Sequence, residues 1–281
     1  MRYQLGLYEK ALPDYLTWEE KLKAAKDAGY DFLEMSIDES EIRLSRLNWS
    51  KEERLELVEL TKRVGIPISS ICLSGHRKYP LGSKDIVTRE KSLEIADKAI
   101  DLACDLGVRI IQLAGYDVYY EASNDDTVRY FEENLRLITE MASAKSVTLG
   151  FETMETEFMD TVDKAMKYVN MINSPYLNIY PDIGNLNNAA IKYSHDIIED
   201  LEEGRGRISA MHLKESKPGH YRNLLFGQGH VDFNLLCEQA YNMSVNRFVT
   251  EFWNLGNENY QEEIKDQILF VRNILDEIYG R

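Results

Sequence analysis

The sequence predicts an eight-stranded α/β barrel, a (β/α)8 or TIM-barrel fold, spanning residues 1–281 as one domain. The length of 281 residues is close to the usual size of one such barrel. Short, β-branched apolar runs alternate along the chain with longer amphipathic runs, which is typical of βα units. The first strand-like run lacks the GxGxxG turn of a dinucleotide site, so a doubly wound sheet is less favoured.

Eight short runs have the composition of buried strands. In chain order they are QLGLYE from Gln4, DFLEMSI from Asp31, PISSICLS from Pro67, RIIQLAGY from Arg109, VTLGFETM from Val147, LNIYPDIGN from Leu177, ISAMHLKES from Ile208 and RFVTEFW from Arg247. In a barrel of this kind the chemistry lies at the carboxyl ends of the strands.

The stretches between these runs place apolar residues at every third or fourth position, which indicates amphipathic helices. The clearest are residues 18–28, 51–64, 89–106, 125–144 and 258–279. Glycines in DAGYDF, RVGIPI and DLGVRI stand where a helix must end before the next strand, a position that favours a left-handed backbone. No Ser- or Gly-rich linker divides the chain into a second domain.

Composition excludes several classes of protein. Acidic residues outnumber basic ones 48 to 33, and a net charge of -15 would repel a phosphate backbone, so no nucleic-acid partner is expected. Cys72, Cys104 and Cys237 are widely spaced, which indicates neither a disulfide framework nor a thiolate zinc site and favours a cytoplasmic protein. No apolar run reaches the roughly 18 residues of a membrane span, so no membrane partner is expected.

Four polar residues stand at the ends of the last four strand-like runs: Glu152, Asp182, His212 and Glu251. Each has an ordinary explanation on its own, because Asp182 could cap a turn, His212 could be a core histidine and the glutamates could face solvent. Consecutive barrel strands, however, bring their terminal side chains to one point. We therefore expect the four side chains to converge.

Three converging carboxylates are costly at neutral pH unless one is protonated or a cation lies between them. Oxygen ligands with one imidazole suit a divalent ion, and manganese, magnesium, cobalt and zinc all remain open. The sequence therefore predicts a divalent metal site. Lys214, two residues beyond His212, should point the same way and could stabilise negative charge developing on a substrate.

Two loops of this acidic chain are basic. The loop after the third strand carries His76, Arg77 and Lys78, and the loop after the seventh carries Lys217, His220 and Arg222. These loops could receive a substrate phosphate, although surface lysines can also serve solubility alone. The FGQGH turn from Phe226 could offer backbone N–H groups to a phosphate or be an ordinary loop turn.

Several longer strings resemble one known family. GLYEKALP, EMSIDES, LSRLNWS, IQLAGYDVYY, YPDIGN and HLKESKPG resemble the L-xylulose-5-phosphate 3-epimerases, equivalently L-ribulose-5-phosphate 3-epimerases, of bacterial pentose and L-ascorbate catabolism. The match runs from the first strand to the last within the xylose-isomerase-like barrels. It implies that Glu152, Asp182, His212 and Glu251 bind one divalent ion, and that Glu152 and Glu251 are the acid/base pair.

The sequence departs from related epimerases of free ketoses at two positions. Asn185 stands where those relatives carry a histidine, and Phe158 stands six positions after Glu152, with Glu155 and Glu157 as the nearest acids. We expect Asn185 and Glu155 to contact the substrate, a ketopentose phosphate. Family habit and the apolar helical faces also suggest a homodimer.

The expected reaction is removal and return of the C3 proton of the pentulose phosphate through an enediolate. Three alternatives stay open at this point. One is an aldose–ketose isomerase of a sugar phosphate, of the hexulose-6-phosphate isomerase type. The others are an endonuclease of damaged DNA, which normally needs more metal-binding histidines and a basic face, and a non-catalytic metal-dependent sugar-binding protein.

Overall fold

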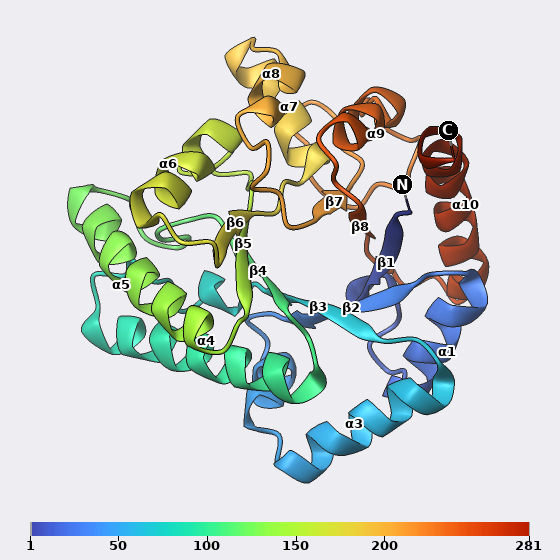
Figure 1. The fold of residues 1–281 in the computed structure, drawn as a ribbon, viewed down its shortest axis with the longest axis horizontal. Coiled ribbons are helices and arrows are strands. Elements are labelled where there is room, and N and C mark those ends of the chain that lie inside the picture. The colour runs from blue at the N-terminus through green and yellow to red at the C-terminus, as the bar shows by residue number, and fades with distance from the viewer. Residues whose placement is uncertain (1, 281) are drawn as a thin grey trace.

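The computed structural model describes residues 2–280 and places a ring of parallel strands at the centre of the molecule, with the helices outside it (Figure 1). All eight expected strands are present. They are β1 (Gln4–Tyr8), β2 (Phe32–Ile37), β3 (Ile68–Leu73), β4 (Ile110–Ala114), β5 (Thr148–Glu152), β6 (Leu177–Ile179), β7 (Met211–Leu213) and β8 (Arg247–Thr250). The predicted α/β barrel is therefore confirmed.

The α-helices within residues 2–280 are α1 (Trp18–Ala28), α2 (Glu41–Ser45), α3 (Lys51–Val64), α4 (Ile86–Leu106), α5 (Asp125–Ala144), α6 (Val162–Ile172), α7 (Ile183–Tyr193), α8 (Ile197–Glu202), α9 (Phe233–Asn242) and α10 (Tyr260–Tyr279). The five expected helices correspond to α1, α3, α4, α5 and α10. Helix α4 begins three residues before the expected start, because the Asp85 side chain accepts hydrogen bonds from Val87 N and Thr88 N. Gly29, Gly65 and Gly107 end α1, α3 and α4 with left-handed backbones, as predicted.

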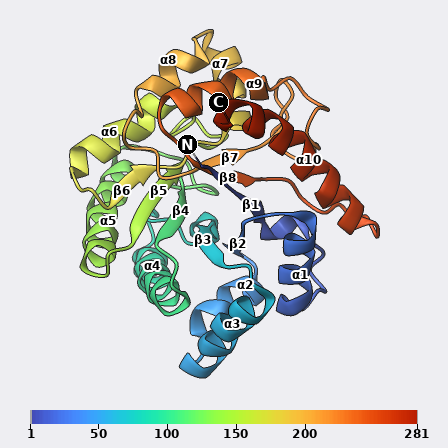
Figure 2. The same ribbon diagram turned by 45° about the vertical axis from the view of Figure 1, so that its right-hand side comes forward.

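From β1 to β6 each strand pairs in parallel with the next, β7 pairs with β8, and β8 pairs with β1. Between β6 and β7 the contact is reduced to two parallel bridges, Ile179 with Ile208 and Asp182 with His212. These bridges close the ring that Figure 2 shows from a second angle. The barrel therefore has its fewest strand-to-strand residue pairs where two of the expected metal ligands, Asp182 and His212, face each other.

Large side chains fill the barrel interior. Phe32, Tyr180, Ala210 and Val249 form one buried cluster with Tyr8 and Cys72. Gly6 leaves room for it, because a Cβ at this position would lie 2.3 Å from the Phe32 ring. The barrel is thus a packed core, and a substrate can approach only from the carboxyl ends of the strands.

Two further predictions concern membrane-spanning segments and disulfide bonds. Among residues 2–280, no helix is long and apolar enough to cross a membrane. Cys72, Cys104 and Cys237 are all free thiols, in agreement with the absence of a disulfide framework.

A buried ion-pair network fixes the start of the barrel. Glu9, which follows β1 and is fully buried, accepts hydrogen bonds from Lys21 of α1 and from both terminal nitrogens of Arg46. Its Oε2 also accepts from Ser36 N of β2, at 2.9 Å. Burial alone would raise the pKa of Glu9, but Arg46 and Lys21 lower it to about 2. The network therefore ties two strands to the first helix.

Glu9→Gln should destabilise the fold by about 3 kcal/mol at neutral pH, because two buried cations lose their counter-ion. The folded-state pKa lies below the unfolded value, so the stabilisation is present above about pH 4.5 and lost as the pH falls toward 2. Urea unfolding between pH 3 and 7, with metal chelated, measures both effects. Glu19→Gln is the control, since the exposed Glu19–Lys23 pair should leave the midpoint unchanged. An unchanged midpoint in Glu9→Gln would contradict the assignment.

Candidate metal centre and active site

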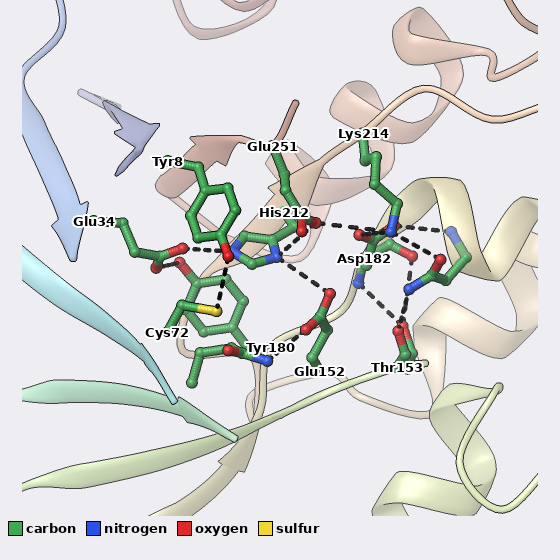
Figure 3. A network of polar contacts seen from close by, with 12 residues as sticks. Tyr8, Glu34, Cys72, Glu152, Thr153, Tyr180, Asp182, His212, Lys214 and Glu251 are labelled. Atoms are coloured by element: carbon green, nitrogen blue, oxygen red, sulfur yellow. Dashed lines mark hydrogen bonds and ion pairs between the residues drawn. The ribbon is translucent and has the colours of Figure 1, made fainter. Parts of the chain in front are cut away.

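Four polar side chains from the last four strands meet at the mouth of the barrel (Figure 3). Glu152 is the last residue of β5, Asp182 follows β6, His212 is central in β7 and Glu251 follows β8. One ligand atom from each lies within 4.8 Å of the others, and all four residues are buried. We call these four residues the acidic cluster.

The two oxygens of Asp182 have different surroundings. Oδ1 accepts a hydrogen bond from Asn185 N at 2.8 Å and caps α7, which is the turn-capping role that the sequence left open. Oδ2 is buried, lies 2.6 Å from Lys214 Nζ and has no hydrogen-bond partner of acceptable geometry. One carboxylate thus begins a helix and also offers an oxygen to the cluster.

The negative charge of the acidic cluster favours binding of a cation. Glu251 Oε2 is a second buried oxygen without a hydrogen-bond partner, and His212 Nδ1 lies 3.1 Å from it and 3.4 Å from Glu152 Oε1. Three carboxylates and one lysine ammonium leave two negative charges, which one divalent ion would neutralise. The orphaned oxygens and the facing imidazole nitrogen therefore fit a divalent metal.

Without a cation, the carboxylates titrate as a coupled group. Burial and repulsion from Glu251 raise the pKa of Glu152, and burial raises the pKa of Asp182 well above its usual range. Burial would also raise the pKa of Glu251, but Lys214 and His212 hold it well below the usual range. Without a cation, the same buried environment therefore shifts the pKa values of Glu152 and Glu251 in opposite directions.

Lys214 is a buried part of the site. Its Nζ donates to Asn185 Oδ1 at 2.8 Å and lies 2.6 Å from Asp182 Oδ2 and 3.7 Å from Glu251 Oε2. Burial would lower its pKa, but Asp182 and Glu251 raise it, so the ammonium stays charged. Asn185 in turn donates from Nδ2 to Thr153 O, so it holds the lysine in place.

Two buried residues that the sequence did not single out hold the ligands. Glu34 of β2 accepts from His212 Nε2 at 2.6 Å, and Gln112 Nε2 of β4 donates to Glu152 Oε2 at 2.5 Å. Both interrupt otherwise apolar strands, in FLEMSI and IIQLA. A polar residue in the middle of a buried strand was the signal that could have found them.

The basic residues expected at the site divide into two groups. Arg77 and Arg222 line the cavity above the acidic cluster together with Glu155, Asn185 and Lys214. The structure does not bring His76, Lys78 or Lys217 to this cavity. His76 is buried with Nε2 at 3.1 Å from Ser92 O, Lys78 lies over the Tyr79 ring, and Lys217 pairs through its backbone with His220. Tyr8 and Lys10 also line the cavity and were not expected there, whereas Trp253, which could wall a sugar pocket or fill the barrel top, does line it.

The FGQGH turn engages protein acceptors. Gly227 N donates to Glu215 Oε2, Phe226 N to Gln267 Oε1 and His230 N to Ser216 O. A Cβ on Gly229 would lie 2.2 Å from Glu215 Oε1, which explains the second glycine. The turn is an ordinary loop turn built around a buried glutamate.

Fold and site together define a class of protein. The chain matches the family described as xylose isomerase-like TIM barrel over residues 22–274, and it belongs to that family. Within it, the chain belongs to the L-ribulose-5-phosphate 3-epimerase family. It is 48% identical to L-ribulose-5-phosphate 3-epimerase UlaE of Escherichia coli K12 over 234 residues, which are 83% of this chain and 81% of that protein.

Other relatives match nearly the whole chain in sequence or in fold. UlaE of Salmonella schwarzengrund is 44% identical over 92% of this chain and 90% of its own length. Among solved structures, an L-ribulose 3-epimerase superposes with a TM-score of 0.78 at 18% identity, covering 100% of this chain and 96% of that one. A D-tagatose 3-epimerase-like protein reaches a TM-score of 0.79 at 18% identity, with 98% of each chain covered. At this identity the structures share the fold.

Replacing Asp182 should separate its two roles. Asp182→Asn keeps an oxygen to cap α7 but removes a charged ligand, and Asp182→Ala removes both. Loss of an outer contact to a metal ligand costs 10–100-fold in affinity, so loss of the ligand itself should cost at least about 100-fold in both variants. The alanine variant should be less stable than the asparagine variant by about 1 kcal/mol.

Zinc titration against a competing chelator and urea unfolding of the metal-free proteins measure the two effects. Asn187→Ala, in the same helix and outside the acidic cluster, is the control for a general effect on α7. Zinc affinity at the wild-type level in Asp182→Asn would remove Asp182 from the site.

Proposed function

We propose that this protein is a metal-dependent 3-epimerase that interconverts L-xylulose 5-phosphate and L-ribulose 5-phosphate. The observation that carries the proposal is the position of two buried glutamates at the ends of one arc. Glu152 ends β5 and Glu251 follows β8, so Asp182 and His212 lie between them along the barrel. Two bases that flank a planar intermediate can invert a stereocentre without turning the substrate.

Glu152, Asp182, His212 and Glu251 would hold the divalent ion, which would polarise the C2 carbonyl and the C3 hydroxyl and so acidify the C3 proton. One glutamate then removes that proton, and the other delivers a proton to the opposite face of the enediolate. Gln112 holds Glu152 by its Oε2, which leaves Oε1 facing the cluster. Lys214 lies beside Asp182 and Glu251, where its charge opposes the negative charge of the enediolate.

The phosphate of the substrate would lie against Arg77 and Arg222 at the outer wall of the cavity. The Arg77 guanidinium lies 4.7 Å over the Tyr119 ring, and its buried Nε has no hydrogen-bond partner. Arg222 already binds Glu155 through Nη2 at 3.0 Å. Arg77 is therefore the stronger candidate for a bidentate phosphate contact.

The remaining expectations rest on the sequence alone. The homodimer and the cytoplasmic location stay predictions. The identity of the metal, among manganese, magnesium, cobalt and zinc, stays open. Substrate roles for Glu155 and Asn185 also stay predictions, although both residues line the cavity.

Glu152→Gln and Glu251→Gln should each reduce epimerisation of L-ribulose 5-phosphate by at least about 100-fold, because each removes one of two required acid/base groups. Proton NMR in deuterated water follows the reaction directly. Wild-type enzyme with restored metal should introduce deuterium at C3 and leave C1 unlabelled. Label at C1 would indicate an aldose–ketose isomerase, and metal binding without label would indicate a sugar-binding protein.

The glutamine variants must still fold, which circular dichroism and thermal unfolding establish. Glu157→Gln is the matched control, because Glu157 lies on the loop that follows Glu152 and its exposed carboxylate pairs with Lys192. Substantial activity in both single variants would refute the acid/base assignment.

Arg77→Gln should raise KM for the pentulose phosphate by roughly 10-fold or more and change kcat less, because the phosphate does not take part in the proton transfer. Lys78→Gln is the control one residue away, since Lys78 points outside the cavity. For the free pentulose, which lacks the phosphate, KM should differ little between the wild type and Arg77→Gln. Equal KM values for the phosphorylated sugar in the wild type and Arg77→Gln would remove Arg77 from the phosphate site.

A further inference from the structure

The imidazole of His212 is held on both sides by carboxylates, and the two sides differ. Nδ1 faces Glu152 and Glu251 of the acidic cluster, whereas Nε2 lies 2.6 Å from Glu34 Oε1 (Figure 3). His212 and Glu34 are both fully buried. Glu34 belongs to β2, far from the ligand-bearing strands in the chain, so the barrel itself brings this pair together.

The position of the Glu34 carboxylate is fixed by two further donors. Its Oε2 accepts hydrogen bonds from Ser70 Oγ at 2.7 Å and from Tyr180 OH at 2.8 Å. The Tyr180 ring also packs edge-on against the His212 ring, with 4.8 Å between centroids. The carboxylate therefore has one oxygen for two hydroxyls and one oxygen for the imidazole.

We propose that Glu34 is a positioning residue that sets the tautomer of His212 and makes Nδ1 the metal-binding atom. This inference rests on the metal-dependent function proposed above. A carboxylate only accepts hydrogen bonds, so Nε2 must carry the hydrogen that lies between the two groups. When an ion lies between Nδ1 and the carboxylates of Glu152 and Glu251, the Nδ1 lone pair would face that ion, and the imidazole would bind it as a neutral ligand.

Glu34→Gln offers a sharp variant because the amide has one acceptor and one donor end. Ser70 and Tyr180 both donate toward the position of Oε2, so the amide oxygen should turn toward them. The amide NH2 group would then donate to Nε2, which forces the hydrogen onto Nδ1, where it faces the ion. The variant keeps the volume and the polar character of the side chain but disfavours the binding tautomer.

Zinc affinity, measured against a competing chelator, should fall 10–100-fold in Glu34→Gln, the cost typical of an altered outer contact to a metal ligand. Ser70→Ala is the matched control, because it removes one donor to the same carboxylate and leaves the Nε2 contact intact. We expect its zinc affinity to stay within about threefold of the wild type. Thermal unfolding of the metal-free proteins shows whether each variant folds.

A second measurement needs no variant. In the zinc-loaded wild type labelled with 15N-histidine, long-range proton–nitrogen correlation spectra distinguish a metal-bound Nδ1 from a metal-bound Nε2. The chain has 5 histidines, and His212→Gln identifies the signals of His212. The proposal expects zinc on Nδ1 and a hydrogen on Nε2. Zinc on Nε2, or wild-type zinc affinity in a folded Glu34→Gln, would overturn it.

Neither measurement uses a sugar, so the two proposals fail separately. A protein that binds zinc through Nδ1 but exchanges no C3 proton would retain this inference and lose the epimerase assignment. A folded wild type that binds no divalent ion would overturn both.

Discussion

The repulsion among three buried carboxylates is the constraint on which the architecture of this site depends. Glu152, Asp182 and Glu251 lie within one small volume from which water is largely excluded, where like charges interact strongly. Lys214 compensates one of these charges, and the two that remain fit a divalent cation. A divalent cation bound among these carboxylates would relieve the repulsion and favour their ionised forms, which the proposed proton transfer requires.

The closure of the barrel explains how these groups are brought together. Strands β6 and β7 are only three residues long, and Asp182 meets His212 through an isolated bridge beyond the end of β6. The chain then turns at once into α7, whose first turn is capped by Asp182 itself. Residues of the site thus stabilise the sparse pairing between β6 and β7. Asp182 caps α7 and also belongs to the acidic cluster.

Most of the fold and the centre of the site could be predicted from the sequence, because both follow from periodicity. Strand ends are recognisable locally, and closure of eight strands makes Glu152 and Glu251 neighbours of the residues between them. Glu34 could not be linked to His212 in this way, since 178 residues separate them and only the barrel curvature joins them. The orientation of loop residues could not be predicted for another reason. His76 and Arg77 belong to the 3-10 helix Gly75–Arg77 and Lys78 follows it, and of these three neighbours only Arg77 lines the cavity.

The acidic cluster and the groups proposed to bind the phosphate lie on different kinds of element. The acidic cluster and its supports Glu34 and Gln112 belong to strands or directly follow them, so packing fixes their geometry. The groups proposed for the phosphate lie on the loops after β3 and β7, and loops vary more easily than strands without disturbing the acidic cluster. Solved sugar epimerases at 12–18% identity share this barrel. The proposed phosphate contacts can therefore change without altering the strand ends that carry the acidic cluster, and Arg77, whose buried Nε has no hydrogen-bond partner, is the loop residue where such a change should act first.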